Sequence, residues 1–141
     1  MLTVLMATRD GAAWLERSLQ SHCRLKPPAG GYKLVIVDNG SGDATVDIIQ
    51  SFRDRLPLTM LHEPRAGKNR ALNRGLRCVE GELVVFTGDD VVVPPDWLVQ
   101  FQRLAAQYPE IAIFGGPVLP LWPQSPPSAI LDAVPHGPAF A

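Results

Sequence analysis

The chain of 141 residues is poor in cysteine and has no long apolar run. Its two cysteines, Cys23 and Cys78, form no CxxC pair and no Cys/His cluster, so we expect reduced thiols rather than a disulfide framework or a zinc site. No apolar stretch approaches the ~20 residues that span a bilayer, and no basic segment precedes an apolar one. We therefore expect no transmembrane segment and no signal peptide, and a cytoplasmic protein that is at most peripheral to a membrane.

An excess of charge of one sign is also lacking, because 13 basic residues face 14 acidic ones and the net charge is −1. This balance gives no general attraction to nucleic acid or to membranes. The sequence has no GxGxxG and no GxxxxGK[ST] motif, which removes the usual dinucleotide and P-loop sites, and it has no GxSxG motif. No internal repeat is visible, so we expect one domain with a core of ordinary size.

What is present is a regular alternation of strand and helix patterns. Apolar, β-branched runs predict strands at residues 2–7, 33–38, 58–61, 82–86 and 111–118. Helical spacing predicts helices at residues 12–22, 43–53, 66–79 and 95–107. This alternation favours an α/β fold with a mostly parallel sheet covered by helices on both faces.

The helical patterns also predict which side chains are buried. The first helix should bury a stripe that includes Trp14, Leu15 and His22, so we expect His22 to be packed rather than catalytic. The helix at 66–79 should bury Leu72, Leu76 and Val79. Asp43 is a good N-cap for the helix that follows it. For the other two histidines, His62 could be structural or functional, and His136 has no evident partner.

Polar side chains follow each of the first four predicted strands. Because parallel strands end at the same edge of a sheet, these residues should meet where open α/β folds bind ligands. The adjacent Asp89 and Asp90 would repel each other unless a divalent cation lay between them and a ligand. A solvated turn is the alternative for one such loop, but four polar loops together outweigh it. The polar residues are Thr8, Arg9, Asp10, Asp38, Asn39, Ser41, Glu63, Asp89 and Asp90.

A basic segment lies at the start of the helix predicted at 66–79. Five cations fall within 13 residues with no acid among them: Arg65, Lys68, Arg70, Arg74 and Arg77. The first backbone N–H groups of a helix suit an anion, so we expect a ligand role for Lys68 and Arg70. We expect Arg74 and Arg77 to form a solvated face, and Asn69 and Asn73 to share one side of the helix. The aromatic residues are not interleaved with the basic ones, which argues against nucleic acid as a partner.

The matching segments together resemble the nucleotide-binding half of a family 2 glycosyltransferase with the GT-A fold. They are MATRDG, VIVDNGSGD, Glu63, GKNRALNRG, VVFTGDDVVVPPDWL and FGGPV, in that order, and they span about Leu2 to Trp122. The resemblance implies a Rossmann-like fold that binds a nucleotide-diphosphate sugar, with a UDP-sugar favoured, together with Mg²⁺ or Mn²⁺. It implies transfer of the sugar to an acceptor that the sequence does not identify.

The resemblance also implies roles for single residues. Thr8 and Arg9 would line the base and ribose pocket, Asp38 would accept a hydrogen bond from the base, and Glu63 would close the pocket. Asn39 and Asp43 would shape the turn after the second strand, with Ser41 a weaker candidate. The remaining residues would lie near the diphosphate, the donor sugar or the metal: Lys68, Asn69, Arg70, Asp89 and Asp90, with Asp90 favoured as the direct metal ligand.

Two features depart from the family pattern. Gly88 stands where the family often has the first of three acids, which leaves Asp89 and Asp90 as the acidic motif. Family members usually continue for another ~100 residues that hold the acceptor site and a general base, and no segment after Val118 resembles that half. We therefore expect a donor-binding domain at residues 1–118, incomplete at the C-terminus, and no catalytic base within this chain.

The segment 119–141 is expected to pack against another surface, since it is apolar, is rich in proline and has Asp132 as its only formal charge. This segment also supports an alternative function, a non-catalytic nucleotide-sugar-binding or interaction module that could self-associate. A GT-A-like nucleotidyltransferase ranks lower, because MATRDG lacks a glycine-rich, basic signature after the first strand.

Overall fold

The computed structural model describes residues 1–122, 124 and 126–129. It divides into two compact units, Met1–Tyr108 and Pro109–Ala141. The first unit contains every strand and helix that is given bounds below. The expectations for His136 and for most of the segment 119–141 concern residues outside the described part of the chain.

Four parallel strands form the sheet of the first unit, in the order β3-β2-β1-β4. They are β1 (Leu2–Thr8), β2 (Tyr32–Asp38), β3 (Leu58–His62) and β4 (Leu83–Thr87). Every residue of β1 is buried because the strand is flanked by β2 and β4 and is covered on both faces. The register aligns Thr8 with Asp38, and Asp38 with His62, so the strands end together at one edge, called the carboxyl edge below.

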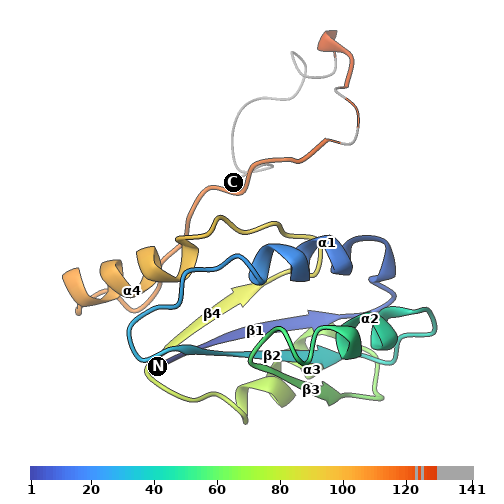
Figure 1. Cartoon of the computed structure of the whole chain (residues 1–141), viewed down its shortest axis with the longest axis horizontal. Helices are drawn as coiled ribbons and strands as arrows, with labels where there is room; N and C mark the ends of the chain where they lie inside the picture. The colour runs from blue at the N-terminus through green and yellow to red at the C-terminus, as the bar shows by residue number, and fades with distance from the viewer. Residues whose placement is uncertain (123, 125, 130–141) are drawn as a thin grey trace. The chain divides into compact units, whose positions relative to one another are not determined.

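Helices cover both faces of the sheet, as expected (Figure 1). One face carries α1 (Ala12–His22), α2 (Thr45–Ser51) and α4 (Trp97–Gln107), and the other carries α3 (Lys68–Leu76). The predicted elements at 2–7, 12–22, 33–38 and 82–86 match the observed ones within one residue at each end. The α/β parallel architecture predicted from the sequence is confirmed.

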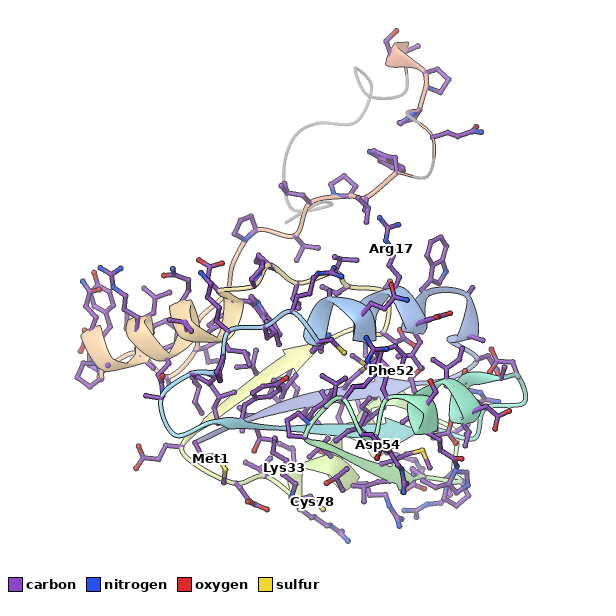
Figure 2. The ribbon with its side chains drawn as sticks, viewed as in Figure 1. Met1, Arg17, Lys33, Phe52, Asp54 and Cys78 are labelled. Carbon is purple, nitrogen blue, oxygen red and sulfur yellow. The ribbon has the colours of Figure 1, made fainter. Side chains whose placement is uncertain are left out.

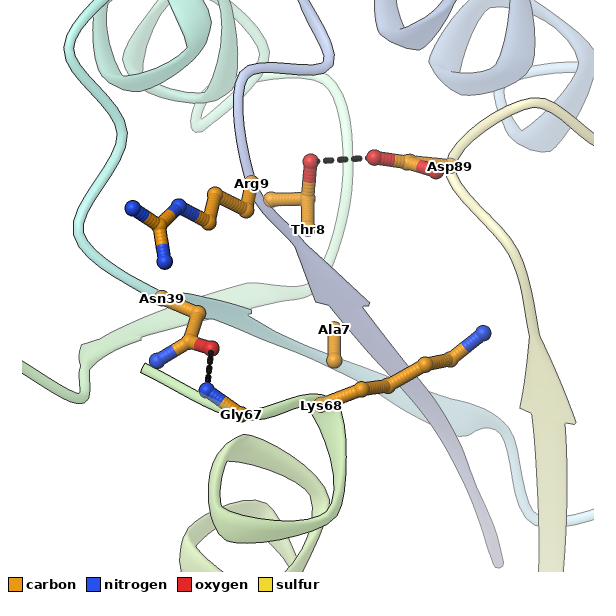
Figure 3. Close-up of a pocket in the computed structure, with 7 residues that line it drawn as sticks. All are labelled: Ala7, Thr8, Arg9, Asn39, Gly67, Lys68 and Asp89. Atoms are coloured by element: carbon orange, nitrogen blue, oxygen red, sulfur yellow. Dashed lines mark hydrogen bonds between the residues drawn. The ribbon is translucent and has the colours of Figure 1, made fainter. Parts of the chain in front are cut away.

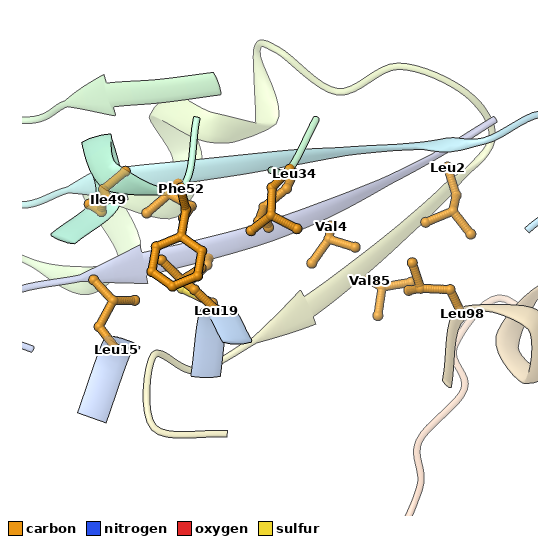
Figure 4. Packing of buried hydrophobic residues seen from close by; sticks show 12 residues of the cluster. Leu2, Val4, Leu15, Leu19, Leu34, Ile49, Phe52, Val85 and Leu98 are labelled. Carbon is orange, nitrogen blue, oxygen red and sulfur yellow. The ribbon is translucent and has the colours of Figure 1, made fainter. Parts of the chain in front are cut away.

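The larger core cluster lies between the sheet and α1, α2 and α4 (Figure 4). Leu15 and Leu19 of α1 and Ile49 of α2 meet Val4 and Leu34 of the sheet there, all fully buried. In Figure 2, Arg17 extends from α1 away from the sheet, whereas Phe52 lies in the interior next to α2. His22 is buried as predicted, but Trp14, predicted to share its stripe, is half-exposed.

The contact between α3 and the sheet is closer than the sequence pattern predicted. The buried residues of α3 are Ala71 and Gly75, which pack with Leu5 and Val37. The prediction that Leu76 is buried was wrong, because the helix approaches the sheet through its small residues and turns Leu76 partly outward. The helix also ends at Leu76, before Val79.

The N-cap of α2 also differs from the prediction. Ala44, not Asp43, occupies the N-cap position. Asp43 instead accepts hydrogen bonds from the backbone N–H and the hydroxyl of Thr45, the first residue of the helix. The carboxylate thus still satisfies an N–H group of the helix start from one residue further out.

The strand predicted at 111–118 is not formed. Residues 109–122 of the second unit have no regular secondary structure, and Ile113, Val118 and Leu119 are exposed. A strand requires a hydrogen-bonded neighbour, and within the described residues the sheet consists of β1 to β4 alone. Among these residues, no helix is long and apolar enough to cross a membrane.

Candidate functional site

A pocket of about 280 Å³ opens at the carboxyl edge of the sheet (Figure 3). The end of β1 supplies Ala7, Thr8 and Arg9, and the loops after β2, β3 and β4 supply the rest of the lining: Asn39, Gly67, Lys68 and Asp89. All four strands therefore contribute, either directly or through the loop that follows them. The pocket brings two cations, one carboxylate and one carboxamide to one small volume.

Thr8 fixes the carboxylate of Asp89. The Thr8 hydroxyl donates a hydrogen bond to Oδ2 of Asp89 over 2.5 Å (Figure 3). Gly11 makes room for this pair, because a Cβ atom there would lie 2.5 Å from Oδ2 of Asp89 and 2.6 Å from the Thr8 hydroxyl oxygen. The hydrogen bond between Thr8 and Asp89 therefore requires the absence of a side chain at position 11.

The loop after β1 is joined to the loop after β2 by reciprocal hydrogen bonds. The Asp10 N–H donates to the Ser41 hydroxyl over 3.0 Å, and the Gly42 N–H donates to Oδ1 of Asp10 over 2.8 Å. The Ala12 N–H donates to Oδ2 of Asp43 over 3.1 Å. The hydrogen bonds from Thr45 and Ala12 hold the pKa of Asp43 below its ordinary value. Asp43 and Ser41 thus shape the rim of the site and do not line the pocket.

Asp38 lies behind the pocket, with a side chain that is only 2% exposed. Its Oδ1 accepts a hydrogen bond from the Ser41 N–H, and its Oδ2 lies 3.3 Å from the Gly40 N–H and 2.9 Å from Nδ1 of His62. Burial by itself raises the pKa of Asp38, but the hydrogen bonds from Ser41, His62 and Gly40 outweigh it and keep the pKa low. Asp38 is consequently a buried carboxylate that is charged at neutral pH and holds the turn after β2.

Asn39 and Glu63 connect the loop after β2 to the loop before α3. The Asn39 carboxamide donates to the carbonyl oxygens of Glu63 and Arg65 and accepts from the Gly67 N–H, each over 2.8 Å. The Glu63 carboxylate accepts from the backbone N–H and the Nε of Arg65. These bonds from Arg65 keep the pKa of Glu63 below its ordinary value.

The start of α3 gives the pocket its second cation. Gly67, the N-cap of α3, has a φ of 136°, which a residue with a side chain rarely adopts. Lys68 follows as the first helical residue and its side chain extends across the pocket (Figure 3). Asn69 and Arg70 are exposed and do not line the pocket.

Asp90 is separated from the pocket by its conformation. It is exposed and is not a lining residue, unlike its neighbour Asp89. Its carboxylate is folded back over Gly88, so that a Cβ atom on Gly88 would lie 2.6 Å from Oδ1 of Asp90. The glycine at position 88 thus provides the space that this carboxylate occupies.

The side chains at the pocket suit a divalent cation that takes most of its ligands from substrate and water. Among the described residues, no three His, Cys, Asp or Glu side chains gather as a metal site. Mg²⁺ commonly binds through one or two carboxylates, with substrate phosphates and water as the other ligands, and Mn²⁺ also favours oxygen ligands. Asp89 lines the pocket and Asp90 does not, so the described side chains offer such an ion one carboxylate and do not form a cage made entirely of protein ligands.

The sequence predicted that the site lies at the carboxyl edge of the sheet, and it predicted part of the pocket lining. Of the predicted site residues, the structure gathers five around the pocket: Thr8, Arg9, Asn39, Lys68 and Asp89. It places Asp38, Asp43 and Glu63 in the supporting loops, and Asn69, Arg70 and Asp90 outside the lining. The sequence suggested Gly67, with the first N–H groups of the helix, as suited to an anion, and the structure places Gly67 in the lining. The role of Gly11 was missed, since a glycine in a loop shows its purpose only when its neighbours are known.

Comparison with known proteins identifies relatives that are named as glycosyltransferases. The family model described as "Glycosyl transferase family 2" matches residues 3–123. The validoxylamine A glucosyltransferase of Streptomyces hygroscopicus subsp. jinggangensis is 29% identical over 100 residues, which are 70% of this chain and 24% of that protein. The PGL/p-HBAD biosynthesis glycosyltransferase of Mycobacterium bovis (strain BCG / Pasteur 1173P2) is 29% identical over 123 residues, or 84% of this chain and 47% of that protein. The chain thus spans less than half the length of these relatives.

Solved structures share the fold. S. aureus TarS 1–349 superposes with a TM-score of 0.70 at 23% identity, covering 75% of this chain and 32% of that one. The mannosyltransferase PcManGT from Pyrobaculum calidifontis, solved in complex with GDP-Man and Mn²⁺, gives a TM-score of 0.69 at 31% identity and covers 74% of this chain and 32% of that one. The family match covers most of the chain, and the chain belongs to glycosyl transferase family 2.

Proposed function

We propose that the chain binds the donor substrate of a metal-dependent glycosyltransferase, a nucleotide-diphosphate sugar. The observation that carries this proposal is the meeting of Arg9, Lys68 and Asp89 in one pocket at the carboxyl edge. Two cations beside a carboxylate suit a diphosphate that binds together with a divalent ion. The presence of GDP-Man and Mn²⁺ in the related mannosyltransferase PcManGT supports both parts of the proposal.

Each group in the pocket has a distinct task in this proposal. Lys68, at the N-terminus of α3, contacts the diphosphate, and Arg9 contacts the phosphate or the ribose. Asp89, assisted by Asp90 after a change of its side-chain conformation, would hold Mg²⁺ or Mn²⁺. Such an ion, when bound, would supply positive charge beside the leaving diphosphate. Thr8 holds the Asp89 carboxylate, and Asn39 holds the loop that carries Gly67 and Lys68. The preference for uracil as the base rests on the family resemblance, because Asp38 does not line the pocket.

Transfer of the sugar needs more than donor binding. The acceptor hydroxyl must be positioned and deprotonated, and both effects contribute large factors to the rate. We propose that the general base lies outside residues 1–118, so that this chain binds donor but transfers sugar slowly or not at all. The acceptor and the rest of the active site then depend on sequence that the longer relatives contain.

Calorimetric titration tests the proposal. UDP and GDP are each titrated into the protein with and without Mn²⁺, and UDP with Mn²⁺ is expected to bind best. Lys68→Ala and Asp89→Asn should weaken binding, whereas the control Lys26→Ala, which removes an exposed cation from the loop before β2, should not. Equal binding by Lys68→Ala and the wild type would contradict the proposed site.

A second candidate, a binding or interaction module without catalysis, is favoured by the exposed apolar side chains of the second unit. Ile113, Leu119 and Leu121 are exposed there, and contiguous exposed apolar surface often marks an interface. Under this alternative the segment would contact a second copy of the chain. Size-exclusion chromatography tests the self-association part of this alternative: a dimer that Leu119→Ser converts to monomer supports the module, and a concentration-independent monomer argues against it.

A further inference from the structure

The loop of residues 63–67, which joins β3 to α3, is held by hydrogen bonds of two side chains, Asn39 and Glu63. We propose that Glu63 is a positioning residue for Lys68: its buried carboxylate fixes this loop, and the loop presents Gly67 and Lys68 to the pocket. The inference rests on the proposed function, because the positioned lysine is the one assigned to the diphosphate. It gives Glu63 a different task from closing the pocket by direct contact.

The contacts of the Glu63 carboxylate lead into its own loop and into α3. Its side chain is only 4% exposed, and Oε1 accepts hydrogen bonds from the Arg65 N–H over 3.0 Å and from Arg65 Nε over 3.2 Å. Oε2 lies 3.8 Å from Nη1 of Arg74, on the second turn of α3. A buried charge must be paired, and here the pairing joins the start of the loop to the helix that follows it.

The backbone of the same loop is fixed from the side of β2. The Glu63 N–H donates to the carbonyl oxygen of Asp38 over 2.8 Å, which continues the pairing of β2 with β3 past His62. The Asn39 carboxamide then holds the loop at the carbonyl oxygens of residues 63 and 65 and at the N–H of Gly67. The loop is thus hydrogen-bonded at residues 63, 65 and 67, and Lys68 is the next residue.

The charge of Glu63 allows a positioning role to be distinguished from a direct electrostatic effect on the diphosphate. Glu63 is anionic at neutral pH, because its hydrogen bonds from Arg65 hold its pKa low. A carboxylate repels a diphosphate, so if Glu63 acted only through its charge, Glu63→Gln would bind UDP more tightly. If Glu63 positions the loop, Glu63→Gln should bind more weakly, since the amide replaces an acceptor with a donor that faces Arg65 and Arg74.

Calorimetry with UDP and Mn²⁺ makes this comparison. We expect Glu63→Gln to lose about 10- to 100-fold in affinity for UDP, the range that is typical when a residue supporting a metal ligand is changed. Glu63→Asp keeps the charge and shortens the side chain, so the positioning role predicts that it also weakens binding. The matched control is Glu82→Gln, which removes an exposed carboxylate at the other end of the sheet and should change little. Tighter binding by Glu63→Gln would overturn the proposal.

A second readout needs no ligand. The Gly67 amide donates to Asn39, so its hydrogen exchange, followed by NMR, reports the loop directly. Both Glu63 variants should exchange this amide faster than the wild type while the amides of β1 stay protected. Unchanged Gly67 exchange in folded Glu63→Gln and Glu63→Asp would overturn the positioning role, whether or not UDP binds. Absence of UDP binding to the wild type would instead refute the proposed function.

Discussion

His62 and Asp38 are paired across neighbouring strands, with Nδ1 of His62 2.9 Å from Oδ2 of Asp38. The carboxylate is almost fully buried, whereas the imidazole is 58% exposed and covers its solvent side. The pair stands next to the pocket, between the turn after β2 and the loop before α3. Like the hydrogen bond from Thr8 to Asp89, it joins residues that follow or end two different strands.

Replacing His62 should make the carboxylate of Asp38 easier to protonate. The hydrogen bond from His62 is one of those that keep the pKa of Asp38 below its ordinary value, so His62→Ala should raise that pKa. A carboxyl with a lowered folded pKa contributes stability at pH values above its unfolded pKa and loses it as the pH falls through the folded pKa. His62→Ala should therefore lose less stability than the wild type on acidification. NMR titration of the Asp38 carboxyl carbon checks the shift, and an unchanged titration would contradict it.

His22 should make the stability of the fold decrease as the pH falls below about 6.5. Its Nδ1 lies 2.9 Å from the carbonyl oxygen of Ser18, and its Nε2 has no hydrogen-bond partner among the described residues. Burial lowers the pKa of His22 below its ordinary 6.5. The unfolded chain then binds the proton more readily, so stability is full above about pH 6.5 and falls below it until the folded pKa is reached.

Urea denaturation at several pH values measures this effect. His22→Phe keeps an aromatic ring beside Trp97 and removes the titrating group. The stability of this variant should therefore fall less than that of the wild type between about pH 7.5 and about pH 5.5, within the usual range of histidine titration. A wild-type protein whose stability does not change across this interval would show that His22 is not held neutral by burial.

Gly11→Ala should disturb the carboxylate of Asp89. The added methyl group would lie 2.5 Å from Oδ2 of Asp89 and 2.6 Å from the Thr8 hydroxyl oxygen, so the hydrogen bond between them has to open. We expect weaker Mn²⁺-dependent binding of UDP, with a smaller effect on binding without metal. Gly115→Ala is the control, because nothing lies within 4 Å of a Cβ atom there. Equal metal dependence in Gly11→Ala and the wild type would show that the Thr8–Asp89 pair does not prepare the site.

Gly75→Ala tests the close contact between α3 and the sheet. A Cβ atom at position 75 would lie 2.3 Å from Cδ1 of Leu5 and 3.0 Å from Cγ2 of Val37. Alanine gains about 1 kcal/mol in helix propensity, but overpacking costs about 1–3 kcal/mol, so we expect a net loss of stability. Asn73→Ala, on the exposed side of the same helix, should be neutral or stabilising. Thermal denaturation compares the two, and a more stable Gly75→Ala would show that the helix moves away easily.

The sheet could be predicted because its strands are apolar on both faces and alternate with clear helical patterns. Val35 and Val37 point to one face and Leu34 and Ile36 to the other, and both sets are buried. The face of α3 could not be predicted in the same way. A search for large apolar residues selects Leu76, whereas the contact with the sheet uses Gly75, whose value lies in its small size.

The site could be located but not assembled from the sequence. Parallel strands bring their ends to one edge, so the gathering of Thr8 and Asp89 followed from the order of the elements. The partners of Asp38 and Glu63 did not, since His62 and Arg65 reach them through the alignment of β2 with β3 and the path of the loop. Asp90 was favoured over Asp89 as the metal ligand, and the structure places only Asp89 in the pocket lining.

Paramagnetic broadening by Mn²⁺ tests the central claim most directly. The 15N-labelled protein is titrated with Mn²⁺ in the presence of UDP, and the loss of amide signals maps the position of the ion. The proposed site predicts that the amides of Thr8, Gly67 and Asp89 broaden first and that Asp89→Asn abolishes this pattern. Broadening centred on another part of the chain, or signals at these three residues that persist while others vanish, would contradict a metal–diphosphate site at the carboxyl edge.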